Sequence, residues 1–469
     1  MKQIGVLPDD ILLEIFDFYL DHMHMSISQI KTEVEVWHLL VHVCRRWRSL
    51  IFRSPRRLNL RLYCTHKTPA RDTLDVWPAA LPLIVSGNGN DMTSSPGVDN
   101  IVVALGQSNR VCQIHLSGPQ LEQQVLAAMH VPFPELTDLR IFSDDETLPV
   151  IPDSFLGRST ATPSRLRSIR LMRIPLPGLP KVLLSAHHLV TLWLYHIPHS
   201  GYIPPEAMVV LLGALSNLKK LSLEFESPKS RPDVEGQSLP LPKRSILPAL
   251  HEFHFKGVTE YLEELLTGID IPQLDEMNIT FFNQIDFDCP RLAQFINRTP
   301  TLRAPEDARM QFSTSTASVQ LWYWKPTFKS GALQISISCR EPDWQLSSIE
   351  QVCNSPLHPL SKVEDLYIGQ YYPQLSWKDD AIENALWLRL LLPFTAVKNL
   401  YLSKVFGPGI VAALQELVGD RITEVLPSLR NIFVEGIEQW GPFQENIGQF
   451  AAARRRSGHP IAISGWLKR

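Results

Sequence analysis

Close groups of histidine, cysteine and carboxylate side chains are the first candidates for chemistry in this sequence. Residues 251–254, HEFH, are one residue short of the H-E-x-x-H spacing that places two zinc-binding histidines on one face of a helix. Residues 22–24, HMH, and 64–66, CTH, supply two ligands each, whereas a structural zinc ion takes four. We therefore expect no metal site and no cofactor.

Motifs for phosphate binding and for nucleophilic catalysis are absent from the sequence. It contains no G-x-x-x-x-G-K-[ST] loop, no G-x-G-x-x-G after a strand and no G-x-S-x-G elbow. The cysteines are scattered, without C-x-x-C spacing, at Cys44, Cys64, Cys112, Cys289, Cys339 and Cys353. This usage is typical of reduced core thiols in an intracellular protein. We expect a non-catalytic protein, with an enzyme site assembled from dispersed residues as the alternative.

Composition indicates a folded chain with a sizeable core. The 469 residues are 44% hydrophobic and 20% charged, enough for two or three domains or for a small module with an extended array. A formal net charge of −3 gives no reason to expect nucleic acid as a partner. No run approaches the roughly eighteen apolar residues of a membrane span, and the first residues carry acids. We expect no membrane partner and an intracellular location, in cytoplasm, nucleus or both.

Two amphipathic stretches must organise the first 55 residues. The first has apolar residues at helical spacing: Leu7, Ile11, Leu12, Ile15, Phe16 and Tyr19. Pro8 suits a first helical turn, and Asp9 and Asp10 suit the positive end of the helix dipole. The second stretch repeats the spacing at Trp37, Leu40, Val41, Cys44, Trp47 and Ile51. Two or three short helices bury little surface alone, so an apolar face remains for a partner.

The order LPDDILLEIF, then LLVHVCRRWRSL and SP, closely resembles the F-box. That family docks on the Skp adaptor of SCF ubiquitin ligases, and through it on a cullin. The resemblance implies an F-box domain over residues 1–54, although the interval 21–35 is longer than in the compact form. The implied adaptor-binding residues are Leu7, Pro8, Ile11, Leu12, Ile15, Phe16, Val43, Cys44, Trp47 and Leu50. The alternative is an N-terminal helical domain with no such partner.

A second pattern, L-x-x-L-x-L, returns from residue 111 onward. Its copies start at Val111, Leu136, Leu166, Leu189, Leu218, Leu250, Leu274, Val363, Val397 and Leu429, a spacing typical of a repeat array. Helical segments are expected between them, over residues 205–217, 259–268, 290–297, 379–392 and 409–426. Residues 302–351 contain strand-like pieces whose register the pattern does not fix. The alternative is an ordinary α/β domain with leucine-rich buried strands.

The periodicity resembles leucine-rich repeats, without the Asn or Cys that regularises the turns of that family. The expected fold is α/β: a small all-α F-box followed by an irregular leucine-rich-repeat-like solenoid, with parallel strands on the concave face and helices on the convex face. The expected substrate-binding domain covers residues 101–469, after a connecting segment, 55–100, with a flexible loop over 86–100. Residues 226–245 are expected to be an insertion, and the arginines at 454–456 to lie on a solvated surface.

Strand residues that point away from the core are the candidates for partner binding, because side chains alternate along a strand. Exposed arginine and aromatic residues commonly anchor interfaces. The predicted substrate-binding residues are Arg140, Arg170, Trp193, Tyr367, Tyr401 and Phe433. The alternative is that inserted loops bury the aromatic members. The resemblances together imply a substrate receptor of an SCF-type ligase that binds a protein substrate. The alternatives are an adaptor-binding scaffold outside any ligase and a non-enzymatic, repeat-based protein-binding module.

Overall fold

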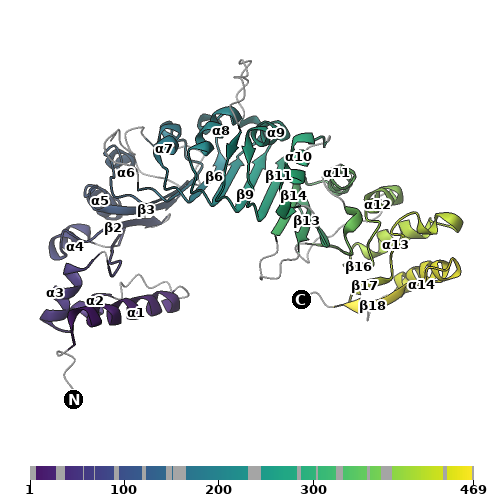
Figure 1. Ribbon diagram of the computed structural model, residues 1–469, viewed down its shortest axis with the longest axis horizontal. Coiled ribbons are helices and arrows are strands. Elements are labelled where there is room, and N and C mark those ends of the chain that lie inside the picture. Colours follow the sequence, from purple (N-terminus) through teal and green to yellow (C-terminus); the bar gives the residue numbers. More distant parts are fainter. Residues whose placement is uncertain are drawn as a thin grey trace. The chain divides into compact units, whose positions relative to one another are not determined.

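The chain is represented by a computed structural model that describes residues 7–27, 37–55, 57–67, 69–88, 95–118, 123–143, 150–151, 165–230, 244–282, 287–302, 305–323, 331–355, 360–370, 383–436 and 441–466. It divides into two compact units, residues 1–201 and 202–469, which are described one at a time. Both units alternate strands with helices, so the fold is mixed α/β (Figure 1).

Three helices begin the first unit: α1 Asp9–Ile27, α2 Trp37–Val41 and α3 Arg45–Arg53. The Phe16 ring meets the Trp47 indole edge-on, with ring centroids 4.7 Å apart. Arg46 closes the start of α1, because its Nη2 donates to the Asp9 carboxylate and to the Leu7 carbonyl, each at 2.6 Å. The first predicted helix is confirmed, whereas the second stretch is two helices with a break at residues 42–44.

Parallel strands and helices alternate through the rest of the first unit. The strands are β1 Leu62–Thr65, β2 Leu83–Asn88, β3 Val111–Gly118, β4 Asp138–Ser143, β5 Ser168–Met172 and β6 Thr191–Ile197. They pair with their sequence neighbours, all in parallel. The helices are α4 Ala70–Val76, α5 Ser95–Leu105, α6 Gln123–Ala128 and α7 Leu179–Ser185, with a 3-10 turn η3 His199–Gly201.

The prediction of a loop over residues 86–100 is wrong at both ends of that range, which belong to a strand and to a helix. Residues 86–88 finish β2, and α5 begins at Ser95. Pro96 is tolerated in the first turn of α5 because its missing N–H has no helical partner there. Val98 and Ile101 are 3% and 0% exposed, so the helix is held by an apolar face that the glycine- and serine-rich composition conceals. Residues 89–94 lie outside the described residues.

The main sheet of the second unit contains β7 Lys220–Phe225, β9 Glu252–Gly257, β11 Glu276–Phe282, β12 Asp307–Phe312, β13 Thr316–Tyr323, β14 Gly331–Ser338, β15 Asp365–Gln370, β16 Asn399–Leu402, β17 Asn431–Glu435 and β18 Ala462–Trp466. A small parallel sheet pairs β8 Ser245–Ile246 with β10 Ile269–Asp270. The α-helices are α8 Pro205–Gly213, α9 Thr259–Gly268, α10 Pro290–Arg298, α11 Pro342–Asn354, α12 Asn384–Leu391, α13 Gly407–Gln415 and α14 Gly441–Arg456. The 3-10 turns are η4 Pro228–Ser230, η5 Pro300–Leu302, η6 Leu360–Lys362 and η8 Gly419–Thr423.

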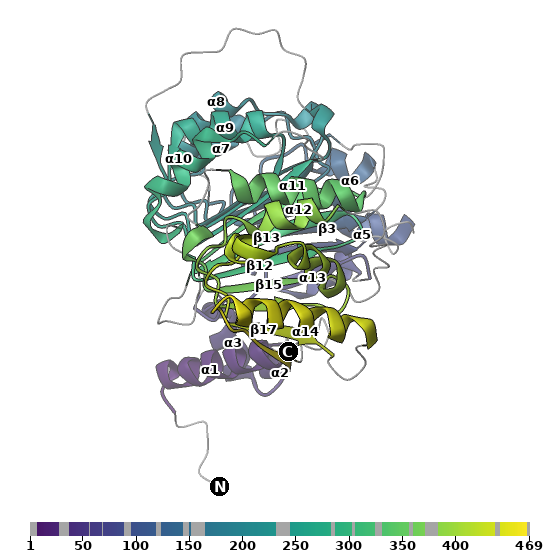
Figure 2. The same ribbon diagram turned by 90° about the vertical axis from the view of Figure 1, so that its right-hand side faces the viewer.

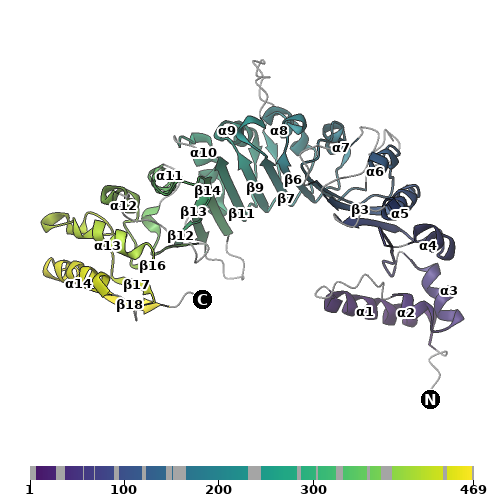
Figure 3. The same cartoon turned by 180° about the vertical axis from the view of Figure 1, so that it is seen from behind.

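All ten copies of the L-x-x-L-x-L pattern coincide with strands, so the predicted array is confirmed as a repeating strand and helix arrangement with a large parallel sheet. Helices α4 to α7 in the first unit, and α8 to α14 in the second, lie along one face of the strands of their unit (Figures 1 and 3). We call the other face, which carries none of these helices, the helix-free face. This arrangement is consistent with a leucine-rich-repeat-like solenoid.

Strands β12, β13 and β14 depart from the repeat. The order in the sheet is β11-β14-β13-β12-β15, and β13 is antiparallel to both neighbours. Ser313 closes the turn between β12 and β13, because its hydroxyl accepts from the Thr316 N–H at 3.0 Å. So short a connection leaves no room for a crossover helix. The expectation of parallel strands throughout is therefore wrong at β13.

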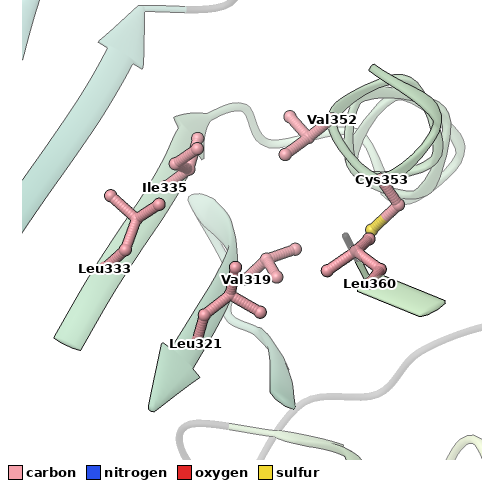
Figure 4. Close-up of a pocket in the computed structure, with 7 residues that line it drawn as sticks. All are labelled: Val319, Leu321, Leu333, Ile335, Val352, Cys353 and Leu360. Carbon is pink, nitrogen blue, oxygen red and sulfur yellow. The ribbon is translucent and has the colours of Figure 1, made fainter. Parts of the chain in front are cut away.

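Helix α11 packs over this antiparallel insertion and leaves a narrow apolar cavity of about 10 Å³. Figure 4 shows its lining, which comes from β13, β14, α11 and η6: Val319, Leu321, Leu333, Ile335, Val352, Cys353 and Leu360. A water molecule needs at least about that volume and several polar partners. The cavity is a packing gap rather than a ligand site.

Four of the predicted helices are confirmed as α8, α9, α10 and α12, although α8 ends at Gly213 rather than at residue 217. Residues 379–382 of the last predicted range lie outside the described residues. The single helix predicted over residues 409–426 is wrong, because α13 ends at Gln415 and η8 follows. Gly419 adopts a φ of +62°, a left-handed conformation that interrupts an α-helix. Figure 2 shows α13 and α14 in the second unit. The solvated surface predicted for the arginines at 454–456 is wrong for Arg454, which is 0% exposed.

Candidate functional site

The predicted adaptor-binding residues divide into an exposed and a buried set. Leu12 and Phe16 are each 1% exposed and Leu50 is 9% exposed, so these three side chains face the interior. The exposed members are Pro8, Ile11, Ile15, Val43 and Cys44, and Leu7 and Trp47 are half-buried. Only the exposed and half-buried members can meet a partner in this conformation.

The exposed members on and beside α1 form a continuous line with one residue that the sequence analysis missed. Pro8, Ile11, Ile15 and Phe18 follow at steps of three and four, which places them on one helix face. Phe18 is 75% exposed, and Leu39 on α2 is another exposed apolar residue, at 57%. We call Pro8, Ile11, Ile15 and Phe18 the N-terminal apolar stripe. Continuing the step beyond Ile15 would have found Phe18.

Cys44 and Trp47 hold the start of α3. Cys44 is the N-cap, and its Sγ accepts from the Trp47 N–H at 3.5 Å. Cys44 is exposed, so it is not the core thiol that the cysteine pattern predicts. Cys64, Cys289, Cys339 and Cys353 are buried free thiols, as expected, and Cys112 is half-buried.

On the helix-free face of the first unit, side chains at one register position form what we call the basic row. His115, Arg140, Arg170 and Trp193 lie side by side on β3, β4, β5 and β6. The Arg170 guanidinium carbon lies 3.9 Å from the centroid of the Trp193 ring. All four side chains are half-buried, so no described loop or helix covers them completely.

Asp138 lies two residues before Arg140 on β4 and orients the basic row. Nε and Nη2 of Arg140 donate to its two carboxylate oxygens at 3.0 and 2.8 Å, and Nε2 of His115 lies 3.7 Å away. Burial alone would raise the pKa of Asp138, but the nearby His115 and the hydrogen bonds and charge of Arg140 lower that pKa to about 2.

Replacing Asp138 by asparagine should make the free energy of unfolding depend less on pH under acidic conditions. Because the folded-state pKa is about 2 and the ordinary value is 3.8, the ionised carboxylate stabilises the fold above that ordinary value, and the contribution disappears as the pH falls through about 2. The lost contribution is roughly 2 kcal/mol. Urea unfolding between about pH 5 and pH 2 checks it. Parallel pH profiles for the wild-type and Asp138→Asn chains would contradict this role.

An open basic cleft of about 470 Å³ adjoins the start of the basic row. Its charged lining includes Arg61, Arg165, Arg167 and Asp138. Arg165 pairs with Glu135, whereas Arg61 and Arg167 form no ion pair with described residues. Together with Arg170, these side chains make this part of the face electropositive.

The corresponding row in the second unit is mainly aromatic. Arg309, Tyr367, Tyr401 and Phe433 share one register position on β12, β15, β16 and β17, and we call them the aromatic row. The rings of Tyr367 and Tyr401 are stacked with centroids 4.1 Å apart, and those of Tyr401 and Phe433 with centroids 4.6 Å apart. The three rings are half-buried.

The residues that lie two positions before the aromatic row on each strand are carboxylates and amides, and they support the row. Asn431 donates to Asn399 at 2.7 Å, and Asn399 donates to Asp365 at 2.8 Å. Asp307 lies opposite Asp365 in the register, and its pKa is raised by burial and then by the neighbouring carboxylates of Asp365 and Glu306. Burial also raises the pKa of Tyr401, which keeps its hydroxyl neutral. This part of the face is therefore electronegative as well as aromatic.

The sequence analysis missed two contributors to the aromatic row. Arg309 lies in the segment whose register the repeat pattern did not fix. Trp466 comes from the last described strand, and its indole meets Tyr401 and Tyr367 edge-on at centroid distances of 5.6 and 6.2 Å. Its Nε1 donates to the Leu402 carbonyl at 3.4 Å. No repeat signal marks Trp466, because β18 lacks the leucine pattern.

His251 and His254, which were considered for metal binding, each lie close to a carboxylate. Nδ1 of His251 lies 3.2 Å from Asp275, and Nε2 of His254 lies 3.8 Å from Glu276. Among the residues that the structure describes, no group of three or more His, Cys, Asp and Glu side chains could hold a metal ion. In the same part of the chain, no helix has both the length and the apolar character needed to cross a bilayer.

Comparison with known proteins adds only a weak likeness to solved structures. No protein-family profile matches the chain, and no curated protein sequence matches it. Among solved structures, the chain is similar to the leucine-rich repeat-containing protein LegL7 from Legionella pneumophila, at 12% sequence identity. The similarity covers 86% of this chain and 99% of that chain, with a TM-score of 0.29. A likeness of this size does not assign the chain to a family or to a function.

Proposed function

We propose that this protein is the substrate receptor of an SCF-type E3 ubiquitin ligase. The N-terminal helices dock on a Skp-family adaptor and through it on a cullin, and the helix-free face of the strand array binds a protein substrate. The observation that carries the proposal is the N-terminal apolar stripe on a segment whose sequence resembles the F-box. Ile11 and Ile15 are 39% and 46% exposed there, beside a buried Phe16.

The helical segment divides its apolar residues in the way that a docking module requires. Leu12 and Phe16 hold α1 to the rest of the segment, and the Phe16 ring contacts Trp47. The N-terminal apolar stripe then remains on the surface of the same helix. Apolar side chains of this size gain about 1.5 to 3 kcal/mol each on full burial, which favours a partner that covers them.

The strand face supports the substrate-binding half of the proposal. The basic row and the aromatic row hold arginine, tryptophan and tyrosine side chains that are half-buried. These types dominate binding energy at protein interfaces because they combine large contact areas with polar groups. Residues of both rows are already held by neighbours, as Arg140 is by Asp138, so little side-chain entropy is lost on binding.

A receptor of this kind needs no catalytic residue of its own. It holds a substrate lysine close to a conjugating enzyme that carries ubiquitin, and the gain in rate comes from proximity. The strand face would therefore determine which protein is modified, and the N-terminal helices would bring it to the rest of the ligase.

The adaptor contact predicts that Ile11→Ser with Ile15→Ser weakens binding of a purified Skp-family adaptor by about tenfold or more. Truncated interface anchors typically cost about 1 to 4 kcal/mol, and about 1.4 kcal/mol is tenfold in affinity. Isothermal titration of adaptor into the full chain measures the affinity.

A matched control is the pair Leu184→Ser and Val210→Ser, which lies on α7 and α8. These residues are 47% and 50% exposed, so the change in surface chemistry is the same. The control chain should bind the adaptor like the wild type. Equal affinity for all three chains would refute the adaptor contact.

A further inference from the structure

The aromatic row is part of a longer stacked column in the second unit. Arg309 lies within it, because its guanidinium carbon is 4.5 Å from the Trp322 ring centroid and 5.3 Å from that of Tyr367. Tyr367, Tyr401 and Phe433 continue the stack with interplanar angles of 10° and 11°. One end of the three-ring stack is thus capped by a guanidinium group.

The other end of the stack has no such cap among the described residues. One face of the Phe433 ring is against Tyr401, so its second face is directed toward β18, where the in-register residue is Ser464. A serine side chain is too small to cover a phenyl ring. The nearby indole of Trp466 contacts Tyr367 and Tyr401, and within the described residues no ring or guanidinium group is recorded against the second face of Phe433.

A carboxylate lies on the same strand as Phe433. Glu435 follows Phe433 by two residues on β17, so both side chains project from the same face of the sheet. Glu435 is half-buried and forms no ion pair with any described residue. A negative charge next to an uncovered aromatic face favours a planar cation that can stack and pair at once.

We propose that Phe433 and Glu435 form an acceptor site for an arginine side chain of a protein partner. The guanidinium would stack on the free face of Phe433 and donate to the Glu435 carboxylate. The protein already contains this kind of contact in each unit, in Arg309 with Tyr367 and in Arg170 with Trp193. The inference rests on the proposed function, because it names the chemistry that the strand face selects in a substrate.

The test compares two labelled peptides, six arginines and six lysines, which carry equal charge. Fluorescence anisotropy with the full chain at about 150 mM NaCl measures both affinities. The wild-type chain should prefer the arginine peptide by about fivefold, because guanidinium stacks on a ring better than ammonium does. Phe433→Leu should abolish the preference, and Glu435→Gln should weaken both peptides by about threefold.

Trp344→Leu and Asp343→Asn are the matched controls, since both residues are exposed on α11, and both chains should keep the wild-type values. An equal affinity of the wild-type chain for both peptides, or an unchanged preference after Phe433→Leu, would overturn the site. Lys468 or Arg469 of the same chain is the alternative occupant of the acceptor site. If Lys468→Ala with Arg469→Ala raises peptide affinity, these residues fill the site and the assignment to a partner is wrong.

This experiment is independent of the adaptor. Loss of the arginine preference with adaptor binding intact would remove the acceptor site and leave the receptor function standing. Absence of adaptor binding with the arginine preference intact would refute the receptor function and leave the acceptor site standing.

Discussion

Replacing Arg454 by methionine is expected to destabilise the C-terminal part of the second unit by about 3 kcal/mol or more. Arg454 is 0% exposed, and among the described residues no carboxylate forms an ion pair with it. Its Nη1 donates to the Ile422 carbonyl at 2.9 Å, and its Nη2 lies 3.4 and 3.5 Å from those of Leu426 and Leu429. Burial lowers the pKa of Arg454, but backbone dipoles keep the charge compensated. Methionine would leave these buried carbonyls without donors.

Hydrogen exchange of α14 and of the segment from η8 to β17 measures this loss, because the chain has two units and need not unfold in one step. Arg455→Met is the matched control, since Arg455 is the exposed neighbour on the same helix, and it should leave exchange unchanged. Arg454→Lys should also destabilise, because an ammonium group cannot reproduce the fork of a guanidinium. Equal protection in the Arg454→Met and Arg455→Met chains would show that the carbonyl contacts contribute nothing.

Replacing Tyr401 by alanine is expected to cost about 2 to 4 kcal/mol of unfolding free energy. Tyr401 is the centre of the aromatic row, with Tyr367 stacked at 4.1 Å, Phe433 at 4.6 Å and Trp466 edge-on at 5.6 Å. Each aromatic pair adds about 0.5 to 1.5 kcal/mol beyond area burial, so one substitution removes several contacts. Under the proposed function, the same substitution also removes a binding anchor.

Tyr401→Phe separates the ring from its hydroxyl, and it should retain most of the stability because the stacking is preserved. Hydrogen exchange of β15, β16 and β17 in the three chains gives the comparison, because the chain need not unfold in one step. A Tyr401→Ala chain as stable as the wild type would mean that the stacked rings are held by the strands alone.

The strands could be predicted from sequence because each carries its own local signal. Leu221 and Leu223, for example, are each 0% exposed on β7, and two apolar residues at alternate positions report that burial directly. The predicted strand residues Arg140, Arg170, Tyr367 and Tyr401 then lie at common register positions, since equal repeats place equal positions side by side. Their role in binding stays a prediction.

The remaining features depend on long-range contacts. The antiparallel strand β13 reverses the order of β12 and β14, which no local spacing encodes. Arg454 is buried only because α14 folds over η8, so a run of three arginines looks solvated in the sequence. The sequence likewise does not separate the exposed from the buried face of α1, because Ile11 and Leu12 are both apolar. Only the packing shows that Leu12 faces inward.

Recovery of the Skp-family adaptor and a cullin with the tagged full chain from cells tests the receptor function most directly. The wild-type chain should bring down both proteins, and the Ile11→Ser, Ile15→Ser chain should lose both together, because the cullin is held only through the adaptor. Adaptor without cullin would indicate a scaffold outside the ligase. Neither protein with the wild-type chain would mean that residues 1–54 are an N-terminal helical domain with no adaptor contact, and it would contradict the proposed function.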